Sequence, residues 1–183
     1  CWWYTATLRC GKWSLVIGLD IPTPGHHPGR LYPLHRGAIF HWNPRNEHND
    51  YQRVENFNRV FSNYKRSAIT EFVKKSSLEI KNNLPNCIIS AAVKPNIYDA
   101  KLTFFQEWDL WLSAGYIDWA VPMNYIVDNN DFVQNMYMII DNIPKKYHDK
   151  IVVGVSTYNQ SPRSVGKKIN RLRRMHFNNI SIF

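Results

Sequence analysis

The stretch GYIDWAVPMNYIVDNND, residues 115–131, runs from a glycine through an apolar segment and ends on polar and aromatic residues. Its apolar part, residues 117–123, has the length of a strand and predicts one that is buried. Asn124 and Tyr125 follow that strand directly. In parallel sheets with helical connections, ligands bind beyond the carboxyl ends of the strands, so both residues are candidates for a binding site.

The alternation of strand and helix continues along the chain from about Asn43. CIISAAV, residues 87–93, is a continuous apolar run of the kind expected in a parallel sheet that is covered on both faces. KIVVGVST, residues 150–157, predicts a third strand, and FNNISIF, residues 177–183, begins a fourth. The segments between these strands are long enough for helical crossovers, which favours an α/β fold with a parallel sheet.

Helices are predicted between the strands from apolar residues at helical spacing. The first begins near Phe61 and ends before Asn82, and the second ends at Gly115, which acts as a C-terminal cap. Asp131 and Ser164 are the expected N-terminal caps of the next two helices. Four βα units are too few to close an eight-stranded barrel, which takes about 250 residues, and the chain stops within a strand. We therefore expect a fragment of a larger fold.

Residues 1–42 differ in composition from the rest of the chain. They are rich in Trp, Pro, His and Gly, and apart from the short run SLVIGLDI they show neither a helical period nor clean alternation. We expect an irregular segment without a packed core of its own, either frame-disrupted or unrelated to the remainder of the protein. The domain boundary is accordingly predicted at residues 42–43, with one domain over residues 43–183.

The net charge of +9 is concentrated in one predicted helix over residues 161–176. Its basic side chains form the outer face of an amphipathic helix, and no aromatic residues alternate with them as single-stranded nucleic-acid binders require. We therefore expect a solvated helix surface and no nucleic-acid partner. The basic residues are Arg163, Lys167, Lys168, Arg171, Arg173 and Arg174.

Membrane spans, metals and nucleotide cofactors are not expected. No run approaches the roughly 18 apolar residues that a span needs, and the first residues lack the regions of a signal peptide. The histidines at positions 26, 27, 35 and 41 and the three cysteines lack the spacing of metal ligands. Neither G-x-G-x-x-G nor G-x-x-x-x-G-K-[ST] follows any strand.

Polar residues that follow the predicted strands are the candidate binding residues. Amide and aromatic groups hydrogen-bond hydroxyls and stack on sugar faces, so this set favours a polar, uncharged ligand over a phosphate. Asp118 stands at the entry of its strand instead, and we expect it to be structural. The candidates for substrate binding are Lys94, Asn96, Asn124, Tyr125, Tyr158 and Asn159.

Three blocks of the chain resemble a known family. They are KRSAITEFVKKSSLEIK with CIISAAVKPNIYDA, then FQEWDLWLSAGYIDWAVPMNY, and KIVVGVSTYNQSP followed by NNISIF. The middle block is the most specific, because members carry Gln-Asp-Trp where this chain has Gln-Glu-Trp at positions 106–108, and Pro-Met-x-Tyr where it has residues 122–125. From about Asn56 onward the chain is thus similar to the glycosyl-hydrolase-like 10 family, bacterial cell-envelope proteins with a (β/α)₈ barrel.

The resemblance implies a partial (β/α)₈ TIM-type barrel, roughly its last four βα units, and the activity of a glycoside hydrolase. The substrate would be a polysaccharide or peptidoglycan glycan in the cell envelope or outside the cell. Members carry a strand like His-Leu-Asp-Tyr-x-Arg-Tyr-Pro upstream. In this chain the nearest candidate is Gly-Leu-Asp-Ile-Pro at residues 18–22, which matches that pattern poorly. We therefore expect the chain to be inactive alone, and the alternative is a barrel remnant that binds glycan without cleaving it.

Glycoside hydrolysis normally needs two carboxyl groups, about 5–5.5 Å apart for retention and about 6.5–9.5 Å apart for inversion. The catalytic candidates are Asp99, on a strand-end loop, and Glu107, at the opening turn of a helix. Asp128 and Asp131 are weaker candidates, since Asp131 is already the predicted cap of a helix. Half a barrel leaves two sheet edges unpaired, so self-association through these edges is also expected.

Overall fold

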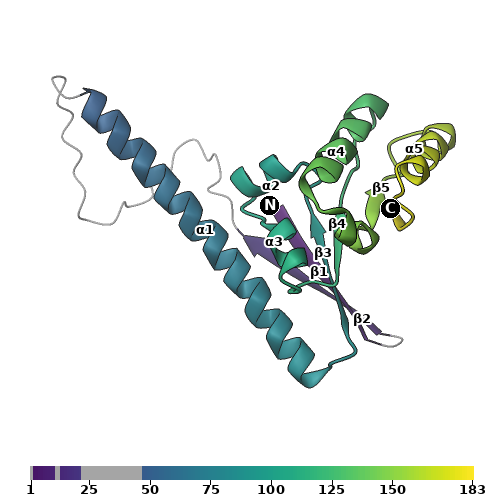
Figure 1. Cartoon of the computed structure of the whole chain (residues 1–183), viewed down its shortest axis with the longest axis horizontal. Helices are drawn as coiled ribbons and strands as arrows, with labels where there is room; N and C mark the ends of the chain where they lie inside the picture. The colour runs from purple at the N-terminus through teal and green to yellow at the C-terminus, as the bar shows by residue number, and fades with distance from the viewer. Residues whose placement is uncertain (1, 11–12, 22–46) are drawn as a thin grey trace.

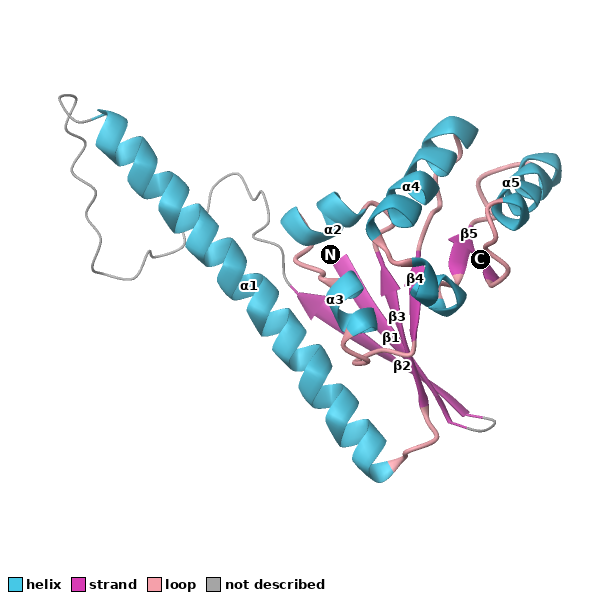
Figure 2. Ribbon diagram, viewed as in Figure 1, coloured by secondary structure: helices cyan, strands magenta, loops and turns pink. Residues whose placement is uncertain are grey.

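The computed structural model of the 183-residue chain describes residues 2–10, 13–21 and 47–183 (Figure 1). Strands and helices alternate over most of this length, as the ribbon diagram in Figure 2 shows. The elements are β1 (Trp2–Cys10), β2 (Trp13–Ile21), α1 (Glu47–Asn83), β3 (Ile88–Val93), α2 (Ile97–Leu102), α3 (Trp108–Ser113), β4 (Trp119–Pro122), α4 (Asn129–Asn142), the 3₁₀ helix η1 (Lys145–Lys150), β5 (Val153–Val155), α5 (Pro162–Arg174) and β6 (Ile180–Ile182).

Four strands form one sheet in the order β2-β1-β3-β4. β1 pairs antiparallel with β2 and with β3, where Ala6 lies opposite Ala91. β3 and β4 are parallel, in a register that pairs Ser90 with Trp119 and runs on to the end of both strands. The parallel pair is the product of the crossover through α2 and α3, as the sequence pattern predicts.

β5 and β6 form a second parallel pair that is joined to the first sheet by isolated bridges. The Val152 N–H donates to the Ala120 carbonyl over 2.9 Å, and the Asn124 N–H donates to the Gly154 carbonyl over 3.1 Å. The four predicted strands therefore run parallel in the order β3, β4, β5, β6. The predicted α/β alternation is confirmed, and the described strands do not close into a barrel.

The N-terminal region differs from the expectation of an irregular segment. Residues 2–10 and 13–21 form strands. β1 pairs antiparallel with the edge of β3 that faces away from β4. The prediction was wrong for these two ranges because the alternation of apolar and polar residues over residues 4–10 was overlooked, and because pairing with β3 is a long-range contact. Residues 22–46, which include the four histidines at positions 26, 27, 35 and 41, lie outside the described residues.

α1 is a single helix of 37 residues that begins well before the predicted start near Phe61. Neither glycine nor proline occurs within it, and it ends at Asn83, two residues before Pro85. Its C-terminal half packs on the core through Ile69, Val73 and Ile80. Figure 1 shows its N-terminal part extending beyond the sheet, and that part carries the exposed side chains of Phe57, Val60, Phe61 and Tyr64.

Apolar side chains of the central strands and of α3, α4 and α5 form one core cluster. Gly115 ends α3 with φ of 74°, which confirms its predicted capping role. The N-terminal caps of α4 and α5 lie three residues earlier than predicted, at Asp128 and Ser161. Both shifts have one cause. The helices begin at Asn129 and Pro162, which are not part of the repeat of apolar residues from which the helices were predicted.

None of the helices in the described part of the chain combines the length and the apolar character that crossing a bilayer requires.

Candidate functional site

The carboxyl ends of β3, β4 and β5 lie on one edge because these strands are parallel. Two tyrosines follow these strands there. Tyr125, three residues past the end of β4, is half-buried, and its ring centroid lies 5.4 Å from that of Phe183. Burial raises the pKa of Tyr125, and the neighbouring Tyr158 raises it further. The phenol of Tyr158, which follows β5, is 74% exposed.

A hydrogen-bond network holds the segment after β5 against the segment after β4. The buried Ser156 hydroxyl donates to Asn159 Oδ1 over 2.7 Å. Asn159 Nδ2 in turn donates to the Tyr125 carbonyl over 3.3 Å. Since Tyr158 stands between Ser156 and Asn159 in the chain, these bonds hold the loop that carries it against the loop of Tyr125. The structure thus brings together three of the predicted binding residues, Tyr125, Tyr158 and Asn159.

Gly154 in β5 is required by the packing of Tyr125. A Cβ atom at this position would lie 3.2 Å from Tyr125 Cε1 and 3.2 Å from the Pro122 carbonyl oxygen. The tyrosine ring therefore rests directly on the backbone of the neighbouring strand. This close approach, together with the contact to Phe183, fixes the ring before any ligand arrives.

Asn124 has a structural role in place of the predicted ligand contact. Its side chain is completely buried, Nδ2 donates to the Phe132 carbonyl over 3.0 Å, and Oδ1 accepts from Asn135 Nδ2 over 3.2 Å. The strand-end position was predicted correctly, but the side chain turns toward α4 and the core. Sequence position alone does not specify that direction.

Lys94 and Asn96 lie beyond the end of β3 and are half-buried. The Lys94 ammonium stands 4.3 Å from the centroid of the Phe104 ring. Asn96 caps α2, with Oδ1 accepting from the backbone N–H groups of Tyr98 and Asp99 over 3.0 and 3.1 Å. Asn96 therefore uses its acceptor on the helix, and its amide donor group is the part that it offers to a ligand.

The two catalytic candidates are held in different environments. Asp99 is exposed in the first turn of α2. Glu107 precedes α3 and turns to α1, where Oε2 accepts from the Thr70 hydroxyl over 3.1 Å and Oε1 lies 3.8 Å from Arg66 Nε. Trp111 Nε1 donates to the same Thr70 hydroxyl over 2.8 Å. Among the described residues, no hydrogen bond or ion pair links Asp99 to Glu107. The contacts of Glu107 connect the start of α3 to α1.

Asp128 and Asp131 are the weaker catalytic candidates, and Asp128 has a clear structural task. Its Oδ1 accepts from the N–H groups of Asn130 and Asp131 over 2.7 and 3.0 Å. These bonds lower the pKa of the Asp128 carboxyl, and the charge of Lys168 contributes in the same direction. Asp131 is exposed in the first turn of α4, where a carboxylate favours the helix dipole.

Asp118 lies at the opposite end of the sheet, as expected for a structural residue. Its Oδ2 accepts from the Ile89 N–H and from Lys81 Nζ, both over 2.8 Å. Lys81 Nζ also donates to the Cys87 carbonyl over 2.7 Å. Asp118 therefore ties the entry of β4 to β3 and to the C-terminal end of α1.

Lys168 is a residue that the sequence analysis placed wrongly on a solvated surface. It is 2% exposed, and its ammonium donates to the Val127 carbonyl over 2.9 Å, to Gln160 Oε1 over 2.7 Å and to the Ile126 carbonyl. Burial lowers its pKa, while Asp128 acts in the opposite direction. A signal was present, because Lys168 shares the apolar face of α5 with Val165 and Leu172 at helical spacing.

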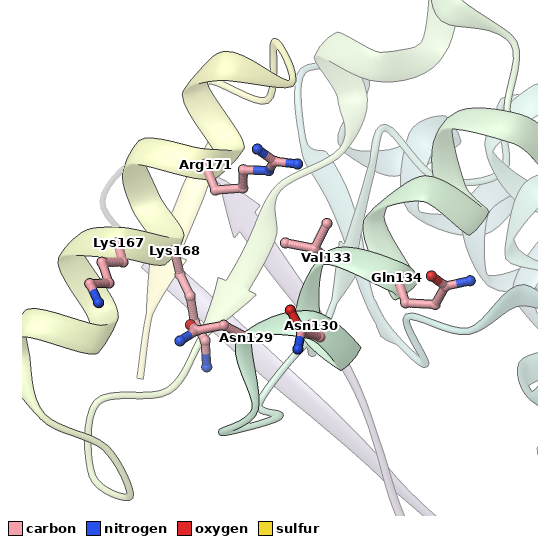
Figure 3. A pocket seen from close by; sticks show the side chains of 7 residues that line it. All are labelled: Asn129, Asn130, Val133, Gln134, Lys167, Lys168 and Arg171. Atoms are coloured by element: carbon pink, nitrogen blue, oxygen red, sulfur yellow. The ribbon is translucent and has the colours of Figure 1, made fainter.

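A pocket of about 510 Å³ lies between α4 and α5, next to this buried lysine (Figure 3). No group of three or more His, Cys, Asp or Glu residues suited to a metal ion occurs in the described ranges. Comparison with known proteins adds no relative, since no family model, curated protein or solved structure matches the chain.

Proposed function

We propose that the described strand ends are the glycan-binding part of a glycoside-hydrolase-like (β/α)₈ barrel of the bacterial cell envelope. The resemblance of the sequence blocks to the glycosyl-hydrolase-like 10 family suggests the class of protein. One structural observation carries the binding role: Tyr125 and Tyr158 follow the carboxyl ends of β4 and β5, close enough for Tyr158 to raise the pKa of Tyr125, at the edge where parallel sheets bind their ligands.

The two rings suit a sugar chain for complementary reasons. Tyr125 is fixed by Gly154 and Phe183, so little rotamer freedom is lost when a sugar packs on it. The Tyr125 phenol is a neutral donor at physiological pH, because its ordinary pKa of 10.0 already lies above that range and burial raises the pKa further. Tyr158 presents an apolar face and a hydroxyl to solvent, the combination that carbohydrate faces and hydroxyls match.

Binding without cleavage is the activity that we propose for this chain alone. Cleavage needs an acid and a second carboxyl group at a defined separation. Asp99 is accessible, whereas Glu107 is engaged by Thr70 and Arg66. Hydrolysis is the second candidate function. It requires a complete barrel, in which the aspartate of the family's His-Leu-Asp-Tyr-x-Arg-Tyr-Pro strand would be the second carboxyl group beside Asp99.

The binding proposal is tested with insoluble glycan. The purified chain is co-sedimented with denuded peptidoglycan and with an insoluble neutral polysaccharide, and bound protein is measured against concentration. Tyr158→Ala is expected to weaken binding about tenfold, equivalent to about 1.4 kcal/mol. Tyr64→Ala is the matched control, because Tyr64 is 69% exposed but lies on α1. Wild-type affinity in Tyr158→Ala, or no glycan retention by the wild type, contradicts the proposal.

Release of reducing sugar separates the two candidate functions. Binding alone predicts that the chain retains glycan and releases no sugar above the level of a heat-denatured control. Turnover that disappears in Asp99→Asn while binding persists would instead assign hydrolysis to this chain.

A further inference from the structure

The pocket between α4 and α5 is lined almost entirely by cationic and amide side chains. Three are cationic, three carry amides, and the only apolar one is Val133. Figure 3 shows the α5 side chains on one side of the pocket and those of α4 on the other. The lining contains no carboxylate, and it consists of Asn129, Asn130, Val133, Gln134, Lys167, Lys168 and Arg171.

Lys168 places a buried positive charge at this pocket, and in the described part of the chain no carboxylate lies within ion-pair distance of it, although the nearby Asp128 offsets part of its charge. Its three donors are satisfied by Ile126, Val127 and Gln160, so it has no hydrogen left for a ligand. Buried charges in proteins are normally balanced by an opposite charge, because desolvation is costly. Lys168 therefore acts through its field, which favours an anion in the pocket beside it.

Lys167 and Arg171 supply the direct contacts. Lys167 is exposed, and no ion pair includes it among the described residues. Arg171 donates one terminal nitrogen to the Tyr137 hydroxyl over 3.1 Å, while its Nε is buried without a hydrogen-bond partner. The buried Nε is closed to a ligand, so the terminal nitrogens of the guanidinium are the groups that can donate to an oxyanion.

The N-terminus of α4 does not itself form this site. Asp128 already accepts from the N–H groups of Asn130 and Asp131, so the first turn of α4 is capped by the chain. Asp128 and the exposed Asp131 oppose an anion near this helix end. The attraction comes from the three cations of α5, and the amides of Asn129, Asn130 and Gln134 add hydrogen-bonding groups suited to hydroxyls.

From these contacts we infer that the pocket between α4 and α5 binds the carboxylate of an acidic sugar in the glycan. This inference rests on the proposed glycan-binding function and specifies its ligand as a negatively charged glycan. The pocket is connected to the tyrosine pair through Gln160, which accepts from Lys168 and directly follows Asn159. One glycan chain is thus expected to contact both Tyr158 and the pocket.

The test compares three probes on the full chain by titration calorimetry: an oligogalacturonate, its methyl-esterified neutral form, and inorganic phosphate. The double variant Lys167→Gln/Arg171→Gln is expected to lose at least tenfold in affinity for the acidic oligosaccharide and less than twofold for the neutral one. Arg163→Gln/Arg174→Gln is the matched control, because it removes the same charge from exposed positions of the same helix outside the pocket. Melting temperatures check that both variants are folded.

Separate outcomes distinguish this inference from the function on which it rests. Equal affinity for the acidic and neutral oligosaccharides, with loss only in Tyr158→Ala, would overturn the anionic pocket and leave glycan binding intact. Phosphate binding that is lost in Lys167→Gln/Arg171→Gln while no sugar binds would overturn the glycan ligand. Weakened binding of the acidic probe in both double variants would show a general charge effect in place of a site. The inference is supported if the affinity for the acidic oligosaccharide depends less on salt concentration in Lys167→Gln/Arg171→Gln than in the wild type, and is unchanged in this respect in the control variant.

Discussion

Asn135 Nδ2 donates to Asn124 Oδ1 over 3.2 Å in the core between β4 and α4, and both side chains are buried. Asn124→Ala removes the partner of the Asn135 amide and one donor contact to the Phe132 carbonyl. We expect a loss of about 1–3 kcal/mol in the free energy of unfolding, measured with urea. A double-mutant cycle with Asn135→Ala checks the cause, because independent effects of the two substitutions would contradict the bond.

Asp118→Ala is expected to destabilise the chain without changing glycan binding. The substitution leaves the Ile89 N–H and Lys81 without their shared acceptor at the end of the sheet opposite the tyrosine pair. The Asp118 and Lys81 side chains are both about one-third exposed, so solvent reduces the effect to about 1 kcal/mol. Urea unfolding and co-sedimentation measure the two properties, and a folded variant that fails to bind glycan would refute the assignment.

Gly154→Ala tests how Tyr125 is positioned. The added Cβ would meet the Pro122 carbonyl and the Tyr125 ring at 3.2 Å, and the carbonyl belongs to the backbone of a paired strand. We expect a destabilisation of about 1–3 kcal/mol and weaker glycan binding. Gly166→Ala is the matched control, since its Cβ would have no neighbour within 4 Å. Unchanged glycan binding in a folded Gly154→Ala protein would indicate that Tyr125 does not contact the ligand.

The stability that the Asp128 cap contributes to α4 is expected to be lost in acid. Its pKa is lowered in the folded state, so its contribution to stability is present above the unfolded value of 3.8 and is lost as the pH falls through the folded pKa. Asn also caps helices but does not titrate. The melting-temperature advantage of the wild type over Asp128→Asn should therefore stay constant well above pH 3.8 and shrink as the pH falls below 3.8. Asp141→Asn, at the other end of α4, serves as the control, and a constant difference for Asp128→Asn would contradict the cap.

The outer edge of β6 predicts self-association. In the described part of the chain β6 pairs only with β5, and Ile182 is 51% exposed. Unpaired strand edges pair with other chains, and an edge lysine opposes this. Sedimentation velocity should show association that rises with concentration and falls in Ile182→Lys. Leu84→Lys, at a position 48% exposed outside the strands, should leave it unchanged. A wild-type monomer at high concentration would refute the prediction.

The prediction succeeded for elements with strong local signals. The continuous apolar runs of β3, β4 and β5 and the glycine after α3 are determined by composition and spacing over a few residues. The helix caps were displaced because Asp128 and Asp131, or Ser161 and Ser164, are equally good caps by residue type. The pairing of β1 with β3 was missed because two distant segments meet there, although β1 does alternate, with Tyr4, Ala6 and Leu8 between Thr5, Thr7 and Arg9.

Local composition and spacing are enough to set the alternation of strands and helices, their parallel order, and therefore the edge at which polar residues gather. Which of those residues face solvent depends on how the elements pack. Asn124 and Tyr158 both follow parallel strands, yet Asn124 bonds to α4 in the core and Tyr158 stands in water. Lys168 belongs to a run of basic residues, but it lies on the apolar face of α5, and the loop after β4 surrounds it with carbonyl groups. Side-chain direction and burial depend on contacts between elements distant in the chain, which local periodicity does not encode.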